Sequence, residues 1–177
     1  MKSKLHIPYY QKGRNFAEQL KNSSNKRNIN KVGFLIKKII NHACETLAYN
    51  CSVNSWRIKL HRMRGVNIGK NVFIGLHCTL DHAYPEYIYL EDDVSLAGDV
   101  YILCHSNPSA QYRNVLESFV APVVIGQGSW IGIRATILPG VIIGKNVVIG
   151  AGSVVNKNVS ENTLVVQKNN KSIKLQL

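Results

Sequence analysis

Aliphatic residues recur at every sixth position through most of the chain. In the second half they stand, without a gap, at Ile125, Ile131, Ile137, Ile143, Ile149 and Val155. Earlier runs occupy Ile68, Ile74 and Leu80, and then Leu90, Leu96 and Ile102, with a four-residue slip at 82–85 between them. A period of six fits neither the 3.6-residue repeat of a helix nor the two-residue repeat of a strand. It therefore requires another kind of repeating structure.

This period predicts stacked coils. Three units of six would form a three-sided coil of 18 residues, in which each unit is a short strand followed by a corner. The aliphatic first residue and the small or β-branched fifth residue of each unit would point inward. Glycine and asparagine at 69–71, 126–128 and 144–146 supply the permissive backbone that tight corners need. Aliphatic side chains 18 residues apart would then lie on one another.

The first third of the chain follows a different pattern. From Val32, apolar residues recur at helical spacing as far as Leu47. The stretch WRIKLHRMRG (56–65) repeats this more briefly, with Trp56, Leu60 and Met63 on one side and Gly65 as a stop. We expect two helices that cover one end of the domain, or alternatively a basic amphipathic surface that lies on a membrane. The expected organisation is a basic helical segment (1–64), a β-helix (65–165) and a C-terminal tail (166–177).

The charge of the chain is concentrated in this first segment. The net charge is +12, and residues 1–64 hold 14 Lys and Arg against two acids, which accounts for all of it. Such a segment favours an anionic partner or is simply a solvated basic face. No apolar stretch is long enough to span a membrane or to act as a secretory signal. The four cysteines form no CxxC pair, so we expect reduced thiols in a cytoplasmic protein.

The repeats resemble those of a known family. Units of the form [Ile/Val/Leu]-Gly-x-x-[small]-x over residues 56–160 are similar to the hexapeptide-repeat acyltransferases. The stretch 56–75 resembles the acetyltransferases of polysaccharide (colanic-acid-like) biosynthesis, and 121–144 resembles these and the maltose and galactoside O-acetyltransferases. The resemblance implies an all-β fold, a left-handed parallel β-helix carrying an N-terminal helical segment. It also implies an acetyl-CoA-dependent O-acetyltransferase of sugars or surface-polysaccharide precursors, without a metal. A homotrimer with active sites between subunits is implied too, in the cytoplasm or at the inner membrane surface.

Two residues break the repeat in ways that suggest chemistry. His105 begins the one long excursion, 103–122, at a corner where its side chain should be reachable. A neutral imidazole can take a proton from an attacking hydroxyl near pH 7, and the resemblance implies that this histidine is the general base. Trp130 lies between two inward-facing residues, so strand alternation sends it outward. The resemblance implies that it packs against the pantetheine arm of coenzyme A, whereas packing against another subunit is the alternative.

The remaining candidate residues come from the same resemblance. Coenzyme A would be held by the backbone N–H groups of Ile133 and Ala151 and by Lys157, Lys171 and Lys174 near its phosphates. The family usually has G-x-P near the last coil, and this chain instead reads VVQKNNKSIK (165–174), which departs from the pattern. For the acceptor, polar groups that could reach a sugar are Asp81, His77, Tyr112 and Arg113.

Two other kinds of function are weighed against the acetyltransferase. A zinc enzyme of the gamma-carbonic-anhydrase type would use His77, His82 and His105. The first and last of these are 28 residues apart, so they would not stack in successive coils. A non-catalytic binding or scaffold module would use the basic first third, which contains no recognised nucleic-acid motif.

Overall fold

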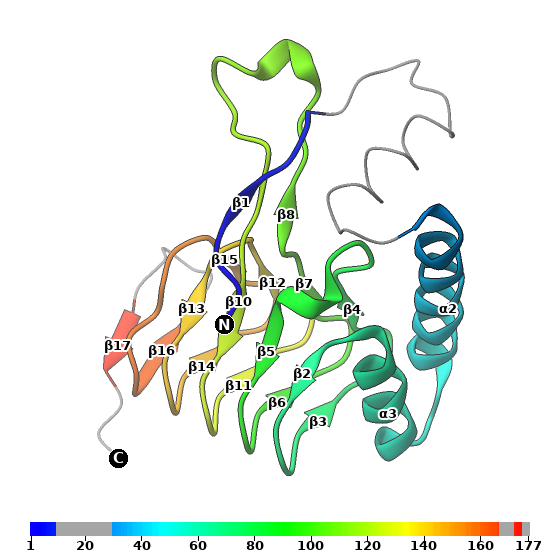
Figure 1. Cartoon of the computed structure of the whole chain (residues 1–177). Helices are drawn as coiled ribbons and strands as arrows, with labels where there is room; N and C mark the ends of the chain where they lie inside the picture. The colour runs from blue at the N-terminus through cyan, green and yellow to red at the C-terminus, as the bar shows by residue number, and fades with distance from the viewer. Residues whose placement is uncertain (10–29, 167–171, 175–177) are drawn as a thin grey trace.

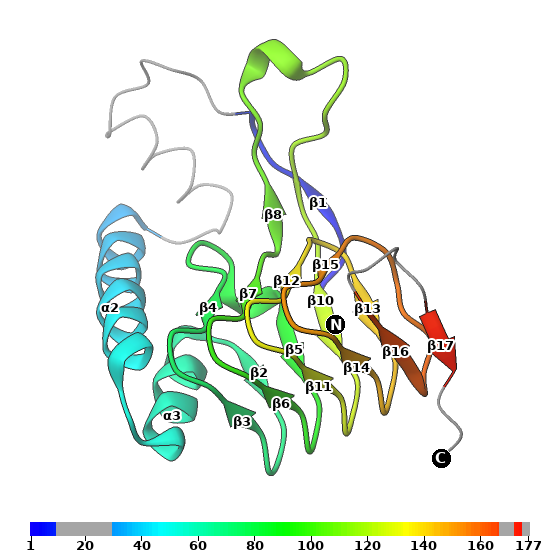
Figure 2. The same cartoon turned by 180° about the vertical axis from the view of Figure 1, so that it is seen from behind.

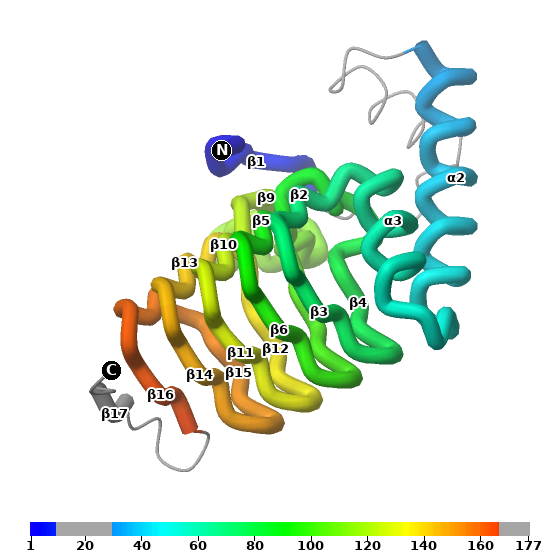
Figure 3. The backbone as a smooth tube through the Cα atoms, turned by 90° about the horizontal axis from the view of Figure 1, so that it is seen from below, coloured from blue at the N-terminus to red at the C-terminus, as the bar shows by residue number. Residues whose placement is uncertain are grey.

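The computed structural model describes residues 1–9, 30–166 and 172–174, and its body is a three-sided parallel β-helix (Figure 3). The first face consists of β2 (Asn67–Ile68), β5 (Ile88–Leu90), β10 (Val123–Ile125) and β13 (Ile142–Ile143). The second face consists of β3 (Phe73–Ile74), β6 (Ser95–Leu96), β11 (Trp130–Ile131), β14 (Val148–Ile149) and β16 (Thr163–Val165), with β17 (Ser172–Lys174) antiparallel at its end. The third face consists of β4 (Thr79–Leu80), β7 (Tyr101–Ile102), β12 (Thr136–Ile137) and β15 (Val154–Val155).

The register of these strands confirms the six-residue prediction. On the second face Ile131 pairs with Leu96 on one side and Ile149 on the other. The first and third faces repeat this register, and the aliphatic first residues of coils two and three are almost fully buried. The small fifth residues also point inward, and the hydroxyl of Ser129 is satisfied by the carbonyl of Gly144. Burial of these stacked side chains is the main favourable term of the fold.

The corners use the residues that the sequence analysis assigned to them. Asn71 and Asn146 have φ values of 52° and 53°, and Gly128 has a φ of 71°. This left-handed conformation is accessible to glycine and asparagine at little cost, whereas a β-branched residue would be strained there. The corners between the first and second faces therefore repeat with little strain.

The two irregular stretches both lie at the corner between the third and first faces. The four-residue slip becomes a turn ending in η1 (Pro85–Tyr87). The excursion 103–122 forms a hairpin of β8 (His105–Ser106) and β9 (Phe119–Val120) with η2 (Ala110–Tyr112) beyond it. This hairpin stands away from the coils, and β1 (Leu5–His6) adds an antiparallel strand to it (Figures 1 and 2). This strand was not predicted, because the pattern over residues 1–64 indicated only a helical segment.

Two helices, α2 (Lys31–Asn50) and α3 (Asn54–Arg64), cover the first coil (Figure 1). The side chain of Asn30 caps α2 by accepting a hydrogen bond from the backbone of Gly33, and Gly65 ends α3 in the left-handed conformation. The two expected helices are therefore present, and "all-β" is too narrow a description of the chain. Among the described residues, no helix is both long and apolar enough to cross a membrane.

Helix α3 faces the body with its polar side, an orientation that the sequence pattern did not predict. Arg57, His61 and Arg64 are buried, whereas Trp56 and Met63 are 64% and 66% exposed. The reason lies in the first coil, whose outer edge presents backbone carbonyls that have no further coil to bind. A buried carbonyl without a partner is costly, so a row of donors fits this surface better than an apolar stripe.

One arginine of α3 serves each face of the β-helix. Arg62 donates from Nη2 to the carbonyl of Gly69 (2.8 Å) at the end of the first face. Arg57 donates from Nε to the carbonyl of Ile74 (2.7 Å) on the second face. On the third face, Arg64 donates from Nη2 to the carbonyl of Leu80 (2.8 Å). Part of the basic excess of the N-terminal third is therefore internal and structural.

His61, beneath these arginines, should make the fold sensitive to acid. Burial, followed by the charges of Arg64 and Arg57, lowers the pKa of His61 from 6.5 to about 3. Between these two values the unfolded chain binds a proton that the native chain does not, so stability falls as the pH falls from 6.5 toward 3. We expect a loss of roughly 2 to 3 kcal/mol at pH 4.5 relative to pH 7.5 from this residue alone.

Urea unfolding of wild type and His61→Gln across this pH range measures the contribution, because the variant lacks the titrating ring. Its stability should change less steeply with pH than that of wild type. His42→Gln, a variant of an exposed histidine on α2, is the matched control and should keep the wild-type slope. Equal slopes in wild type and His61→Gln would contradict the expectation.

Candidate active site

The candidate site lies at the corner between the third and first faces, where two polar side chains meet. Asp81 directly follows β4, and His105 begins the hairpin that leaves β7, the next strand of the same face. His105 Nδ1 lies 2.7 Å from Asp81 Oδ2. The carboxylate is fully buried, whereas the side chain of His105 is 21% exposed. The pair therefore has a buried end and an accessible end.

Backbone donors surround the Asp81 carboxylate. Its Oδ1 accepts hydrogen bonds from the N–H groups of Ala83 and Tyr84 (both 2.9 Å), and its Oδ2 accepts one from Cys104 (2.6 Å). Burial alone would raise the pKa of this carboxyl, but the hydrogen bond and charge of His105 and the N–H groups of Cys104 and Tyr84 outweigh it. The pKa of Asp81 therefore lies below its ordinary value, and the group is ionised near neutral pH.

An ionised Asp81 fixes the chemistry of the imidazole. A carboxylate only accepts hydrogen bonds, so Nδ1 of His105 must carry the proton. Nε2 of the neutral ring is then free to accept another. The rings of His82 and Tyr84 lie against His105, with centroids 5.8 Å and 5.4 Å away, and help to hold its orientation. This geometry is that of a general base with a buried orienting carboxylate.

Cys104, next to the base, is not suited to act as a nucleophile. Its thiol is completely buried in the core of the β-helix. Burial, with the charge of Asp81 as a second cause, raises the pKa of the Cys104 thiol. The reactive form of cysteine is the thiolate, so this environment does not favour a covalent step at Cys104.

The residues expected to hold coenzyme A lie elsewhere on the chain. Trp130 is 53% exposed on the outer side of the second face, as predicted. Ile133 and Ala151 lie at the corner between the second and third faces in successive coils. The N–H of Gly152, next to Ala151, donates to the carbonyl of Ile133 (2.8 Å). Lys157 is exposed at the corner between the third and first faces, the edge from which His105 emerges, but in the last coil.

These donor candidates and His105 do not form one cleft within a single chain. Trp130 faces outward from the second face, whereas His105 is at the corner where the third face ends. Of the two C-terminal lysines, Lys174 lies on β17 in register with Thr163, and Lys171 falls outside the described residues. One chain therefore presents His105 and Lys157 on one edge, whereas Trp130, Ile133 and Ala151 lie on other sides.

Of the four acceptor candidates, only Asp81 contacts His105. Its burial and its backbone partners leave no carboxylate oxygen accessible to a sugar, and its one side-chain partner among the described residues is His105. His77 is at the corner between the second and third faces, where it pairs with Asp99 (3.6 Å) and its ring lies 4.9 Å from that of Tyr49. Tyr112 and Arg113 are exposed near the far end of the projecting hairpin (Figure 1).

The three histidines of the zinc alternative are not brought together. His82 and His105 are neighbours, but His77 lies at a different corner. Within residues 1–9, 30–166 and 172–174, no three His, Cys, Asp or Glu side chains converge to hold a metal ion. The histidine and carboxylate at the candidate site instead bond to each other.

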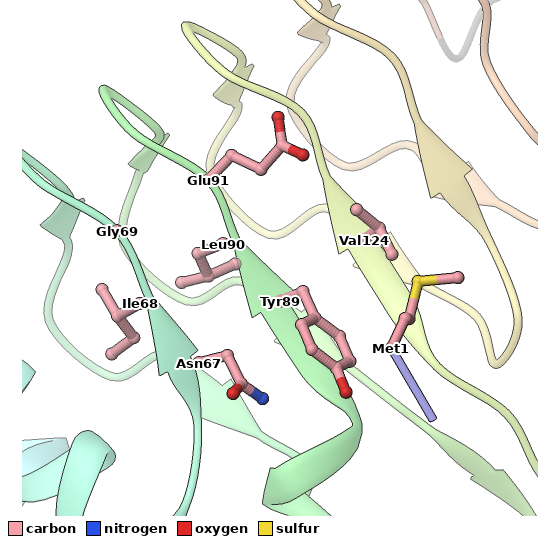
Figure 4. Close-up of a pocket in the computed structure, with 8 residues that line it drawn as sticks. All are labelled: Met1, Asn67, Ile68, Gly69, Tyr89, Leu90, Glu91 and Val124. Atoms are coloured by element: carbon pink, nitrogen blue, oxygen red, sulfur yellow. The ribbon is translucent and has the colours of Figure 1, made fainter. Parts of the chain in front are cut away.

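A shallow hollow on the outer side of the first face is a separate feature. Figure 4 shows it between Met1, Tyr89, Glu91 and Val124. Glu91 is already engaged there, because its carboxylate accepts a hydrogen bond from the N–H of Gln127 (3.0 Å). No candidate catalytic or donor residue lines this hollow.

The fold and the site together define a class: a β-helix of hexapeptide repeats with a histidine–carboxylate pair at an open corner. Residues 122–157 match the bacterial transferase hexapeptide family (six repeats), and residues 65–104 match the hexapeptide repeat of succinyl-transferase. These matches confirm the resemblance of the repeats to the hexapeptide-repeat acyltransferases. Together with the solved acetyltransferases of the same fold, they support a left-handed β-helix.

Named relatives agree with this resemblance. The putative lipopolysaccharide biosynthesis O-acetyl transferase WbbJ of Escherichia coli K12 is 29% identical over 66% of this chain and 74% of its own length. Galactoside O-acetyltransferase of the same organism is 34% identical over 56% of this chain, and the match spans about half (48%) of that relative. The crystal structure of a maltose O-acetyltransferase from Clostridium difficile 630 superposes with a TM-score of 0.60 at 29% identity, covering 80% of this chain and 89% of that one.

Proposed function

We propose that this protein is an acetyl-CoA-dependent O-acetyltransferase whose acceptor is a sugar or a surface-polysaccharide precursor. The observation that carries the proposal is the His105–Asp81 pair, with Nδ1 engaged and Nε2 free at an accessible corner. Relatives named as O-acetyltransferases of galactosides, maltose and lipopolysaccharide support the acceptor class. The solved galactoside acetyltransferase that holds coenzyme A shares the fold, with a TM-score of 0.57 at 22% identity.

In the proposed reaction the acetyl group moves directly to the acceptor. Nε2 of His105 takes the proton of the acceptor hydroxyl while the hydroxyl oxygen attacks the thioester carbonyl carbon. The C–S bond then breaks, the new C–O ester bond remains, and the departing sulfur takes up the proton from His105. No acyl-enzyme is needed, because a thiolate is a good leaving group and Cys104 is buried. Backbone N–H groups are the expected donors to the transient oxyanion.

We further propose that separate copies of the chain complete one site. Within one chain, Trp130 and His105 lie on different sides of the β-helix. If a neighbouring copy placed its second face against the corner that carries His105, its Trp130 would approach that histidine. The homotrimer expected from the sequence resemblance meets this requirement, and Tyr112 and Arg113 would then reach an acceptor bound at the site of a neighbour.

Titration calorimetry with acetyl-CoA tests the donor side without knowledge of the acceptor. We expect binding in the micromolar range by wild type, and binding weaker by about tenfold or more in Trp130→Ala, which removes a large exposed aromatic face. Trp56→Ala is the matched control, because Trp56 is also exposed (64% against 53% for Trp130) but lies on α3. It should bind like wild type.

Two results of this titration would count against the proposal. Failure of wild type to bind would mean that the altered C-terminal segment, which lacks G-x-P, does not support this donor. An equal loss in both tryptophan variants would mean that Trp130 has no specific role in donor binding.

A further inference from the structure

Helix α2 has two opposite apolar sides, and only one of them is covered. Phe34, Cys44 and Ala48 are buried against the rest of the molecule. On the other side, six large apolar residues are between 36% and 68% exposed: Val32, Leu35, Ile36, Ile39, Ile40 and Leu47. Their spacing places them along one stripe of the helix. Single exposed apolar residues are ordinary, but a contiguous set of this size indicates an interaction surface.

The stripe continues onto α3. Ile36 and Ile40 line a shallow hollow together with Met63 of α3. Trp56 precedes Met63 by seven residues, which is two turns, so it lies on the same side of α3. We call the six residues of α2 together with Trp56 and Met63 the outer apolar surface. It lies at the helical end of the molecule, away from the C-terminal coil (Figure 3).

The charges around this surface have one sign. The exposed cations of the two helices are Lys31, Lys37, Lys38, Lys59 and Arg62. Glu45 is the one acidic residue of the two helices, and its carboxylate lies 3.4 Å from the buried guanidinium of Arg64. Arg57 and Arg64 do not contribute to the outer charge, because both are buried. Lys37 lines the hollow beside Ile36, Ile40 and Met63. Lys38 instead lies over the ring of the buried Phe34, 5.7 Å from its centroid. The helices that carry the outer apolar surface thus expose cations without matching acids of their own.

The exposed cations distinguish two possible partners of this surface, a second copy of the chain and a lipid bilayer. A second copy that docked through this same surface would bring like cations together. An anionic bilayer accepts apolar side chains at the boundary between headgroups and acyl chains and attracts the surrounding cations. We propose that the outer apolar surface docks on an anionic lipid bilayer.

This docking would place the candidate active site near the bilayer. The side chain of Asn41 on α2 donates to the backbone carbonyl of His82, whose ring contacts that of His105. Arg64 of α3 donates to the backbone carbonyl of Asp81 (3.1 Å). The docking helices thus contact the segment that carries the base. The inference does not depend on the proposed function, since lipid binding requires neither donor nor acceptor.

Vesicle sedimentation with the full chain tests the proposal. Wild type should sediment with vesicles that contain phosphatidylglycerol and not with pure phosphatidylcholine vesicles, and raising the salt from about 0.1 M to about 0.5 M should weaken the binding. The triple variant Ile36→Gln, Ile39→Gln, Ile40→Gln should bind at least about tenfold more weakly, because it loses apolar burial. Lys37→Gln with Lys59→Gln, which removes one exposed cation from each helix, should weaken binding by about tenfold and flatten its salt dependence.

A matched triple variant is available at exposed apolar residues outside the two helices: Val115→Gln, Leu116→Gln and Val154→Gln. It should bind vesicles like wild type. The proposal is overturned if wild type does not sediment with anionic vesicles, or if the control triple variant loses as much binding as the α2 triple variant. Light scattering tests the competing arrangement, in which the surface joins copies of the chain. That arrangement would be indicated if wild type bound no vesicles and the α2 triple variant formed a smaller assembly than wild type.

Discussion

Replacing His105 by alanine is expected to lower the turnover of acetyl transfer by about 100- to 10,000-fold, the usual contribution of a general base. The expectation rests on the free Nε2 of a ring whose Nδ1 is held by Asp81 (2.7 Å). Release of free thiol from acetyl-CoA in the presence of galactoside and maltose acceptors measures the turnover. Acetyl-CoA binding by calorimetry should stay within about twofold of wild type, since general-base catalysis acts on the chemical step.

His42→Ala is the control for this experiment, because it removes an exposed histidine of α2 that lies outside the candidate site. It should keep wild-type turnover. If His105→Ala retained more than about a tenth of the activity, general-base catalysis by this residue would be untenable. Loss of both turnover and donor binding would instead indicate that the corner is distorted.

Asp81→Asn is expected to lower kcat by about 100-fold or more, although Asp81 contacts no substrate. The N–H groups of Ala83 and Tyr84 would keep the amide oxygen on their side, so the amide NH₂ would face His105. Nδ1 would then have to accept a hydrogen bond, and the ring proton would move to Nε2. A ring protonated at Nε2 cannot take the proton of the acceptor hydroxyl. Asp81 is thus a positioning residue.

Two readouts separate this role from simple structural damage. The KM for acetyl-CoA should change little while kcat falls. ¹⁵N NMR of histidine-labelled protein should show His105 protonated at Nδ1 in wild type and at Nε2 in Asp81→Asn. An unchanged tautomer in an inactive variant, or a variant with more than about a tenth of wild-type kcat, would contradict the positioning role.

The sequence predicted the parts of this structure that repeat. A period of six, once read as three strands per coil, is sufficient to place Ile131 between Leu96 and Ile149 and to turn Trp130 outward. It also located the excursion 103–122 and the partly exposed position of His105. These predictions succeed because in a β-helix the inward or outward direction of each side chain follows directly from its place in the repeat.

The parts that depend on irregular segments could not be predicted. Asp81 meets His105 because a four-residue slip and a hairpin leave the same corner. The strands there pair residues 22 apart, as Leu80 with Ile102, so the register does not place residues 24 apart in contact. The orientation of α3 was not predicted, because it depends on the edge carbonyls of the first coil, which accept hydrogen bonds from Arg57 and Arg64. β1 is a two-residue strand and has no pattern of its own.

The three arginines of α3 also cover the open edge of the first coil, where the β-helix begins. The edge of a parallel β-helix coil is a template on which another coil, including one from a second molecule, can add strand by strand. With Arg57, Arg62 and Arg64 bound to the carbonyls of the three faces, that template is occupied from within the chain. The same basic segment therefore protects the protein against growing end to end into fibres.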